Sequence, residues 1–186
     1  MPRTKRLTDN AVLDAAVRVM FRMGPSDFTL AHVSAEAGIA PSTLVQRFGD
    51  KHGLVVRAAQ RDNARFSAVL AEAPRAVGVD AVIDLFWALT PGEDDEASLA
   101  DQLLWLRQDL RDPELNALAR ARRALLRDAV AERLPPLSVS PQEGARLIEA
   151  QWQGALHQWG LDPQGALHDY VAESLAAWFA LASPPE

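Results

Sequence analysis

The stretch Thr29–Lys51, TLAHVSAEAGIAPSTLVQRFGDK, predicts two short helices joined by a tight turn. Thr29 is expected to cap the first helix, because a threonine hydroxyl accepts a hydrogen bond from a backbone N–H group of the first turn. Gly38 supplies the left-handed backbone that ends this helix. Pro41 suits the first turn of the next helix, where a missing N–H group costs least. The order of these residues predicts a helix-turn-helix.

Each of the two helices has one apolar side. Leu30, Val33 and Ala37 are spaced to line the inner face of the first helix. Leu44 and Phe48 are four residues apart, so they bury one side of the second helix. The opposite side of that helix shows the polar residues Ser42, Thr43, Gln46 and Arg47. This shape and this chemistry are typical of a helix that enters the major groove of DNA.

The segment resembles the N-terminal DNA-binding domain of the TetR family of transcriptional regulators, over residues 8–55. The chain departs from the family at Val45, where the family usually has a tyrosine whose hydroxyl reaches a phosphate. Arg47 stands where the family often has histidine, and this cation would replace part of the lost contact. The matching positions are Val12–Ala16, Phe21–Gly24, Phe28–Leu30, Val33, Ser34, Ala37–Ile39, Thr43, Leu44, Phe48, Lys51 and Leu54.

The predicted DNA-binding residues follow from this resemblance and from side-chain chemistry. The resemblance implies that Thr43 and Lys51 contact phosphates, and Thr29 lies at a helix N-terminus, which favours a phosphate. Gln46 suits an adenine edge, and Arg47 suits a guanine or a phosphate. The complete set is Thr29, Pro41, Ser42, Thr43, Val45, Gln46, Arg47 and Lys51, with Pro41 and Ser42 expected at thymine methyls or base edges. The alternative is an ordinary solvated helix face.

Charge is distributed unevenly along the chain. The net charge of −6 combines +4 in residues 1–66, which hold ten Lys or Arg and six Asp or Glu, with −10 in the remaining 120 residues. A polyanion is attracted to the first third and repelled by the rest. Arg3, Lys5 and Arg6 form a basic arm, which either contacts DNA or only favours solubility.

The composition predicts an all-α fold of about nine helices. Ala, Leu and Arg are abundant, which favours helices, and no alternating apolar pattern is long enough for a strand. Besides the motif, helices are expected at residues 9–23, 51–73, 76–90, 95–110, 113–133, 141–160 and 163–182, with Asp50, Asp95, Asp112 and Asp162 as caps. Two domains are predicted: a three-helix DNA-binding domain over residues 1–55, and a helical ligand-binding and dimerisation domain over residues 56–186.

Several kinds of site have no support in the sequence. There are no cysteines, and His32, His52, His157 and His168 lack a metal-binding spacing. No nucleophile–base spacing and no glycine-rich phosphate loop is present, so we expect no catalysis, metal or cofactor. The acidic residues 93–96 are interpreted as a solvated helix entrance. There is no signal peptide and no apolar run of about 18 residues, so we expect a cytoplasmic location.

Aromatic residues gather in the predicted C-terminal domain. Helices with large apolar faces enclose cavities, and the family resemblance implies a ligand there, which the aromatic residues suggest is apolar or aromatic. The candidate ligand-binding residues are Trp87, Gln102, Trp105, Gln108, Asn116, Gln151, Trp152 and His157. The alternative for each tryptophan is plain core packing.

The last two helices carry apolar stripes that predict a homodimer. Two such helices from each subunit would form a four-helix bundle, and Gly154 and Ala155 are small enough for close helix approach. The expected interface residues are Ile148, Gly154, Ala155, Trp159, Leu167, Tyr170, Val171, Ser174, Leu175 and Trp178. The alternative is that both stripes face only their own subunit.

These features predict a DNA-binding transcriptional regulator, interpreted as a repressor that a small molecule releases from a palindromic operator. The helix expected at 51–73 would transmit the effect of ligand binding to the DNA-binding domain. One alternative is a helical small-molecule binding protein without specific operator binding, and a second is a helical enzyme acting in the tryptophan-lined cavity.

Overall fold

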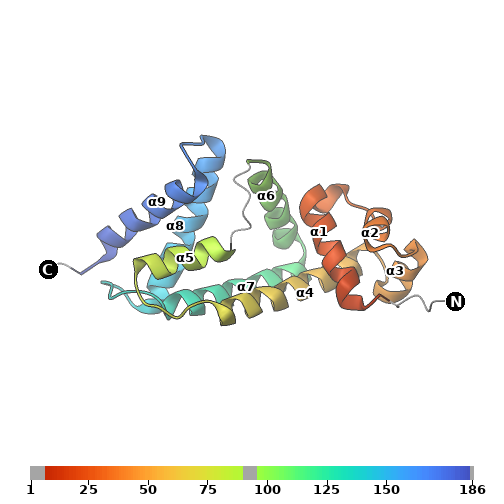
Figure 1. Ribbon diagram of the computed structural model, residues 1–186, viewed down its shortest axis with the longest axis horizontal. Coiled ribbons are helices and arrows are strands. Elements are labelled where there is room, and N and C mark those ends of the chain that lie inside the picture. Colours follow the sequence, from red (N-terminus) through yellow and green to blue (C-terminus); the bar gives the residue numbers. More distant parts are fainter. Residues whose placement is uncertain (1–6, 90–95, 185–186) are drawn as a thin grey trace. The chain divides into compact units, whose positions relative to one another are not determined.

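The computed structural model describes residues 7–89 and 96–184, with the side chains of residues 25, 26 and 96–102 outside the description. Within these ranges the chain forms nine helices and no strand (Figure 1), so the all-α prediction is confirmed. The helices are α1 Asp9–Asp27, α2 Leu30–Ala37, α3 Pro41–Phe48, α4 Lys51–Glu72, α5 Val79–Leu89, α6 Glu96–Arg111, α7 Pro113–Ala131, α8 Pro141–Leu161 and α9 Leu167–Ala182. No helix in these ranges is long and apolar enough to cross a membrane.

The chain divides into two compact units. The N-terminal unit comprises Met1–Arg65 and Asp101–Ala119, and the C-terminal unit comprises Phe66–Ala100 and Arg120–Glu186. This division differs from the predicted one at residue 55. The reason is hydrophobic: Leu115 is buried in the N-terminal core, and Trp105 and Leu118 pack against it. Helices α4, α6 and α7 therefore contribute residues to both units.

In the N-terminal unit, α2 packs against α1 and α3 (Figure 1). Thr8 caps α1 by accepting a hydrogen bond from the N–H of Ala11, at 3.3 Å. Gly24, with φ at +73°, interrupts the regular helix near its predicted end. The core includes Val33 and Leu44, which were predicted to be buried, and Val12 of α1.

Local capping sets the ends of the two motif helices as predicted. Thr29 accepts from the N–H of His32 at the start of α2, and Gly38 ends α2 in the left-handed conformation, with φ at +66°. Pro41 occupies the first turn of α3. The Asp50 carboxylate accepts from the N–H of Gly53 at 2.8 Å, so it caps α4 as expected.

The C-terminal unit has its own core, which α5, α8 and α9 largely build. Helix α9 packs along α8 and also contacts α5. The buried side chains include Phe86, Ile148 and Leu175. Arg133 is also buried and donates to the carbonyls of Ala73, Pro74 and Ala129, near the ends of α4 and α7. This guanidinium is satisfied by the carbonyl groups that helix ends leave unpaired.

Two predicted helix starts are wrong by several residues. Helix α9 begins at Leu167 and not at 163, because Gly165 has φ at +73° and its carbonyl accepts a hydrogen bond from Trp159 Nε1. Helix α5 begins at Val79 and not at 76, since the N–H of Gly78 donates to the carbonyl of Arg133. A nearby side-chain donor in the first case, and a backbone carbonyl distant in sequence in the second, holds the preceding segment outside the helix. The cap predicted at Asp95 lies outside the described residues, and Asp162 ends α8 and does not cap α9.

Candidate nucleic-acid interface

Helix α3 has one buried face and one exposed face. Leu44 is 1% exposed and Phe48 is also buried, so these two side chains anchor the helix to the N-terminal core. The exposed face carries Pro41, Ser42, Val45 and Gln46, and Val45 is 49% exposed. Thr43 lies at the edge of this face and is half-buried. A helix held by its apolar side and open on the other is the arrangement that a DNA groove requires.

Arg47 differs from the expected outward position. Its side chain is only 14% exposed, and Nη1 donates to the carbonyl of Leu7 at 2.9 Å and lies 3.4 Å from the Asp9 carboxylate. The helical period explains this difference, because Arg47 is one turn from the buried Leu44 and so lies at the edge of the apolar face. The guanidinium therefore ties α3 to the start of α1.

The N-terminus of α2 is closed by a reciprocal pair of hydrogen bonds. Thr29 Oγ1 accepts from the N–H of His32, and His32 Nδ1 accepts from the N–H of Thr29 at 3.2 Å. Histidine is not the usual partner in such a capping box, which more often has Glu or Gln at this position. His32 was set aside as a metal ligand because of its spacing, and its role in the helix cap was not predicted. Its spacing of three residues from Thr29 was the signal for this role.

Lys51 begins α4 next to the end of α3. Its ammonium lies 4.2 Å from the centroid of the buried Phe28 ring. A cation over an aromatic face is held by the quadrupole of the ring. This contact holds the ammonium over the Phe28 ring, and the residue is partly exposed.

Paired charges surround α1 and α2. Arg18 and Arg22 each lie 3.1 Å from the Glu36 carboxylate, and hydrogen bonds from Arg22 and then Arg18 lower the pKa of Glu36. Arg61, at 3.0 Å, donates to Asp14 and is the largest cause of the lowered pKa of that carboxyl group. Part of the positive charge counted in the first third is therefore neutralised within the unit.

Comparison with known families decides the nature of this unit. Residues 12–58 match the model of a family described as bacterial regulatory proteins, tetR family. The N-terminal domain is a TetR-family domain. The match spans α1 to the first turns of α4, which includes every residue of the exposed face of α3. The chain is thus a DNA-binding transcriptional regulator.

Solved structures share the fold of the whole chain. A transcriptional regulator from Rhodococcus sp. Rha1 is 16% identical, with 96% of this chain and 100% of that chain covered and a TM-score of 0.77. The multidrug binding protein EbrR complexed with proflavin is 23% identical, with 90% of this chain and 96% of that chain covered and a TM-score of 0.63. FadR from Bacillus subtilis, in complex with stearoyl-CoA, is 16% identical, with 91% of this chain and 97% of that chain covered and a TM-score of 0.62. No curated protein matches the chain.

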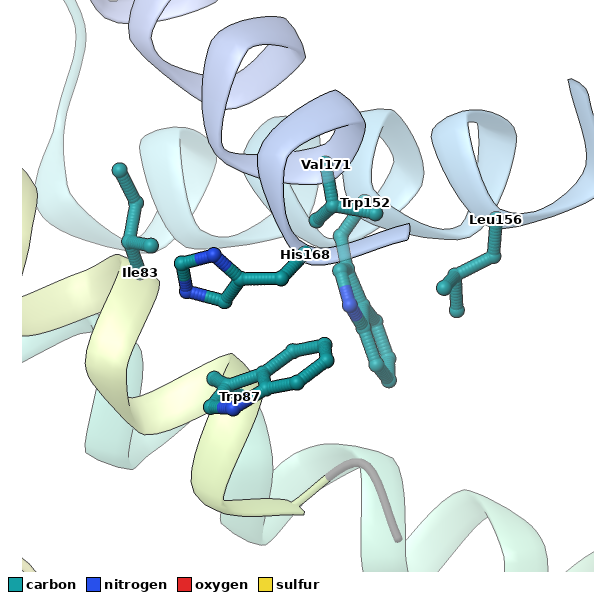
Figure 2. A pocket seen from close by; sticks show the side chains of 6 residues that line it. All are labelled: Ile83, Trp87, Trp152, Leu156, His168 and Val171. Carbon is teal, nitrogen blue, oxygen red and sulfur yellow. The ribbon is translucent and has the colours of Figure 1, made fainter. Parts of the chain in front are cut away.

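Two of the predicted ligand residues line one small cavity in the C-terminal unit. Trp87 from α5 and Trp152 from α8 face the same space, which Ile83, Leu156, His168 and Val171 complete (Figure 2). The cavity holds about 10 Å³, which is close to the least space that one water molecule needs. His168 was not predicted as a lining residue, and its ring packs edge-on against Trp87 with centroids 4.6 Å apart. A shallower hollow of about 160 Å³ in this unit contains none of the predicted ligand residues.

The other predicted ligand residues lie elsewhere. Gln151 donates to Ser174 Oγ at 2.8 Å, between α8 and α9, and His157 is exposed. Trp105, Gln108 and Asn116 belong to the N-terminal unit, where Trp105 packs against the core. The side chain of Gln102 lies outside the described residues.

The residues predicted for the dimer interface separate into two groups. Six of them are buried in the core of their own subunit: Ile148, Ala155, Trp159, Leu167, Val171 and Leu175. Gly154, Tyr170, Ser174 and Trp178 remain partly exposed on α8 and α9. The dimer interface stays a prediction, and the exposed group is the part of it that a second subunit is able to reach.

Proposed function

We propose that this regulator is a repressor that a small-molecule ligand releases from a palindromic DNA operator. The observation that carries the proposal is the exposed face of α3, where Ser42, Val45 and Gln46 point away from the core on a TetR-family helix-turn-helix. Two copies of this helix, related by a two-fold axis, would enter successive major grooves about 34–36 Å apart. The basic arm at residues 3–6 lies outside the described residues and would add contacts to the DNA backbone or minor groove.

The proposed ligand is apolar or aromatic and binds at Trp87 and Trp152. Support comes from the aromatic lining of this cavity and from the fold shared with EbrR and FadR, which were solved with proflavin and stearoyl-CoA. A space of about 10 Å³ admits no such molecule. Binding would therefore require that the two indole rings move apart. The ligand would then bind only the conformation with the open cavity, and this difference in affinity would shift the equilibrium towards that conformation.

The proposed homodimer uses the exposed sides of α8 and α9. Gly154 has open space where a Cβ atom would lie, and Tyr170, Ser174 and Trp178 are partly exposed on α9. A glutamate at Gly154 would place a charge in the proposed four-helix bundle without touching the core. Gly154→Glu should shift the protein to a monomer in light scattering, whereas Gly154→Ala should remain dimeric. If Gly154→Glu remained a dimer, the interface would have to lie on another surface.

Release of DNA follows from differential binding. The ligand would prefer a dimer in which the separation of the two α3 helices does not fit the operator. The loss of operator binding is limited by the ratio of the ligand's affinities for this dimer and for the DNA-binding dimer. Helix α4 is the proposed connection, because its residues belong to both units.

Selection from random DNA duplexes with the full chain tests the proposal. The expected result is one enriched, near-palindromic sequence whose binding weakens steeply with salt. The competing function, a helical small-molecule binding protein without an operator, predicts no enriched sequence. Mobility shifts with the selected duplex would then show whether aromatic compounds that quench tryptophan fluorescence also release the DNA.

A further inference from the structure

We infer that α3 reads A·T base pairs, with the Gln46 amide on adenine and the Val45 methyl groups on thymine, and that no cation of α3 reads a guanine. This inference rests on the proposed function, because it concerns the operator that the same helix would bind. It names the class of base pair beneath the helix, which neither the family nor the similar structures specify.

The exposed face of α3 carries no charge. Its four side chains are Pro41, Ser42, Val45 and Gln46, which offer two apolar surfaces, one hydroxyl and one amide. Guanine is most often read by an arginine or lysine that donates to its O6 and N7 atoms. No side chain on this face is able to make that charged contact.

Arg47 is the one cation of α3, and its position argues against a base contact. Its Nη1 atom donates to the Leu7 carbonyl at 2.9 Å and lies 3.4 Å from an Asp9 oxygen. Turning Arg47 toward a groove would break both contacts and leave the Leu7 carbonyl without this donor. An unmade hydrogen bond to a partly buried carbonyl opposes that movement.

The chemistry of the two exposed residues in the middle of α3 matches an A·T pair. A glutamine amide donates to N7 and accepts from N6 of adenine in one planar arrangement. Thymine alone among the four bases presents a methyl group in the major groove, and an exposed valine offers it an apolar surface. Val45 and Gln46 are successive residues, about 100° apart around the helix, so they would meet neighbouring base pairs.

Base analogues in the selected operator give the direct test. Replacing thymidine by deoxyuridine, one position at a time, removes only the methyl group. We expect one position per half-site at which the wild type loses about fourfold in affinity, the worth of one buried methyl group. Val45→Ala should show no loss at that position. An equal loss for both proteins would overturn the role of Val45.

A second analogue tests Gln46. Replacing adenine by 7-deazaadenine removes the N7 acceptor, which should weaken wild-type binding by about fivefold, the lower end of the range for a bidentate pair. Gln46→Ala should be insensitive to the same analogue. Both substituted residues are exposed, so the thermal midpoint of each variant should equal that of the wild type and show that folding is intact.

The outcomes separate this inference from the proposed function. An enriched operator whose α3-contacted positions are G·C would overturn the inference and leave the repressor proposal standing. No enriched sequence at all would overturn both. An A·T-rich operator whose affinity is the same with deoxyuridine or 7-deazaadenine at every position would also overturn the inference, because the preference would then arise from DNA shape.

Discussion

His52 Nε2 lies 2.7 Å from Asp112 Oδ2, which joins the first turn of α4 to the residue before α7. The other oxygen of Asp112 accepts from the N–H groups of Glu114 and Leu115, at 2.9 and 3.1 Å. One carboxylate thus caps α7 and holds the start of α4, which follows α3 directly in the chain. The hydrogen bond from Leu115 is the largest cause of the lowered pKa of Asp112, and the contact with His52 adds to it.

The first prediction concerns pH. Because the folded-state pKa of Asp112 is lowered, its contribution to stability is complete above its unfolded pKa, about 4, and is lost as the pH falls through the lower folded value. Asp112→Asn keeps an acceptor but no charge, so it should lower the melting temperature at pH 7 and lose this difference towards pH 3. The lowered pKa values of Asp14 and Glu36 affect the wild type and the variant alike, so they do not change the difference between the two melting curves. Melting curves that stay equally far apart at every pH would contradict this account of Asp112.

The second prediction compares two neighbours on α3. Leu44 is fully buried, so Leu44→Ala should cost about 2–5 kcal/mol in the free energy of unfolding of the N-terminal unit. Val45 is half exposed, and Val45→Ala should change that free energy by less than about 0.5 kcal/mol. Urea unfolding followed by circular dichroism measures both. Equal losses would mean that the two faces of α3 are not the ones described.

The third prediction concerns two glycines in helices. A Cβ atom at Gly53 would collide with the carbonyl of Phe48, so Gly53→Ala should destabilise the joint of α3 and α4 by roughly 1–3 kcal/mol. Nothing lies within 4 Å of a Cβ atom at Gly154, where alanine should stabilise α8 by roughly 0.5–1 kcal/mol. Opposite shifts in melting temperature are therefore expected. Operator binding should weaken only for Gly53→Ala.

The fourth prediction concerns a buried carboxylate in the C-terminal unit. Glu149 is 1% exposed and pairs with Arg123 at 2.7 Å and with Arg127. Both arginines are partly hydrated, so Glu149→Ala should cost about 2 kcal/mol, below the range for fully buried pairs. Glu143→Ala breaks the exposed pair with Arg146 and should leave thermal unfolding unchanged. An unchanged melting temperature for Glu149→Ala would show that hydration fully replaces this pair.

Much of the fold was predictable because its signals are local. Thr29, Gly38 and Asp50 act on groups within a few residues, and each is found at the helix end where it was expected. The burial of Leu44 and Phe48 followed from their spacing of one helical turn. The start of α9 was not predictable in this way, since a hydrogen bond from Trp159 to the Gly165 carbonyl holds the preceding segment.

In the candidate site, too, local signals predicted only part of the arrangement. A helical period assigns Gln46 to the open side of α3, but Arg47 lies at the boundary between the faces, where a distant carbonyl and carboxylate decide its direction. Similarly, the abundance of tryptophan indicated an aromatic cavity, and only packing brought Trp87 and Trp152 to one space while Trp105 joined the other unit. Aromatic side chains fit core, cavity and interface equally well by composition.

The amino-acid sequence by itself determined most of the helices, the helix-turn-helix and the outward direction of Ser42 and Gln46 on α3, because capping and apolar spacing act through neighbours along the chain. Only the tertiary structure decided that residues 101–119 complete the N-terminal core, that Arg47 turns to Leu7, and that six apolar residues expected between subunits fill their own subunit. The physical reason is that the hydrophobic effect is not directional. An apolar stripe on a helix predicts that the stripe is buried, but the rest of the fold determines which surface buries it.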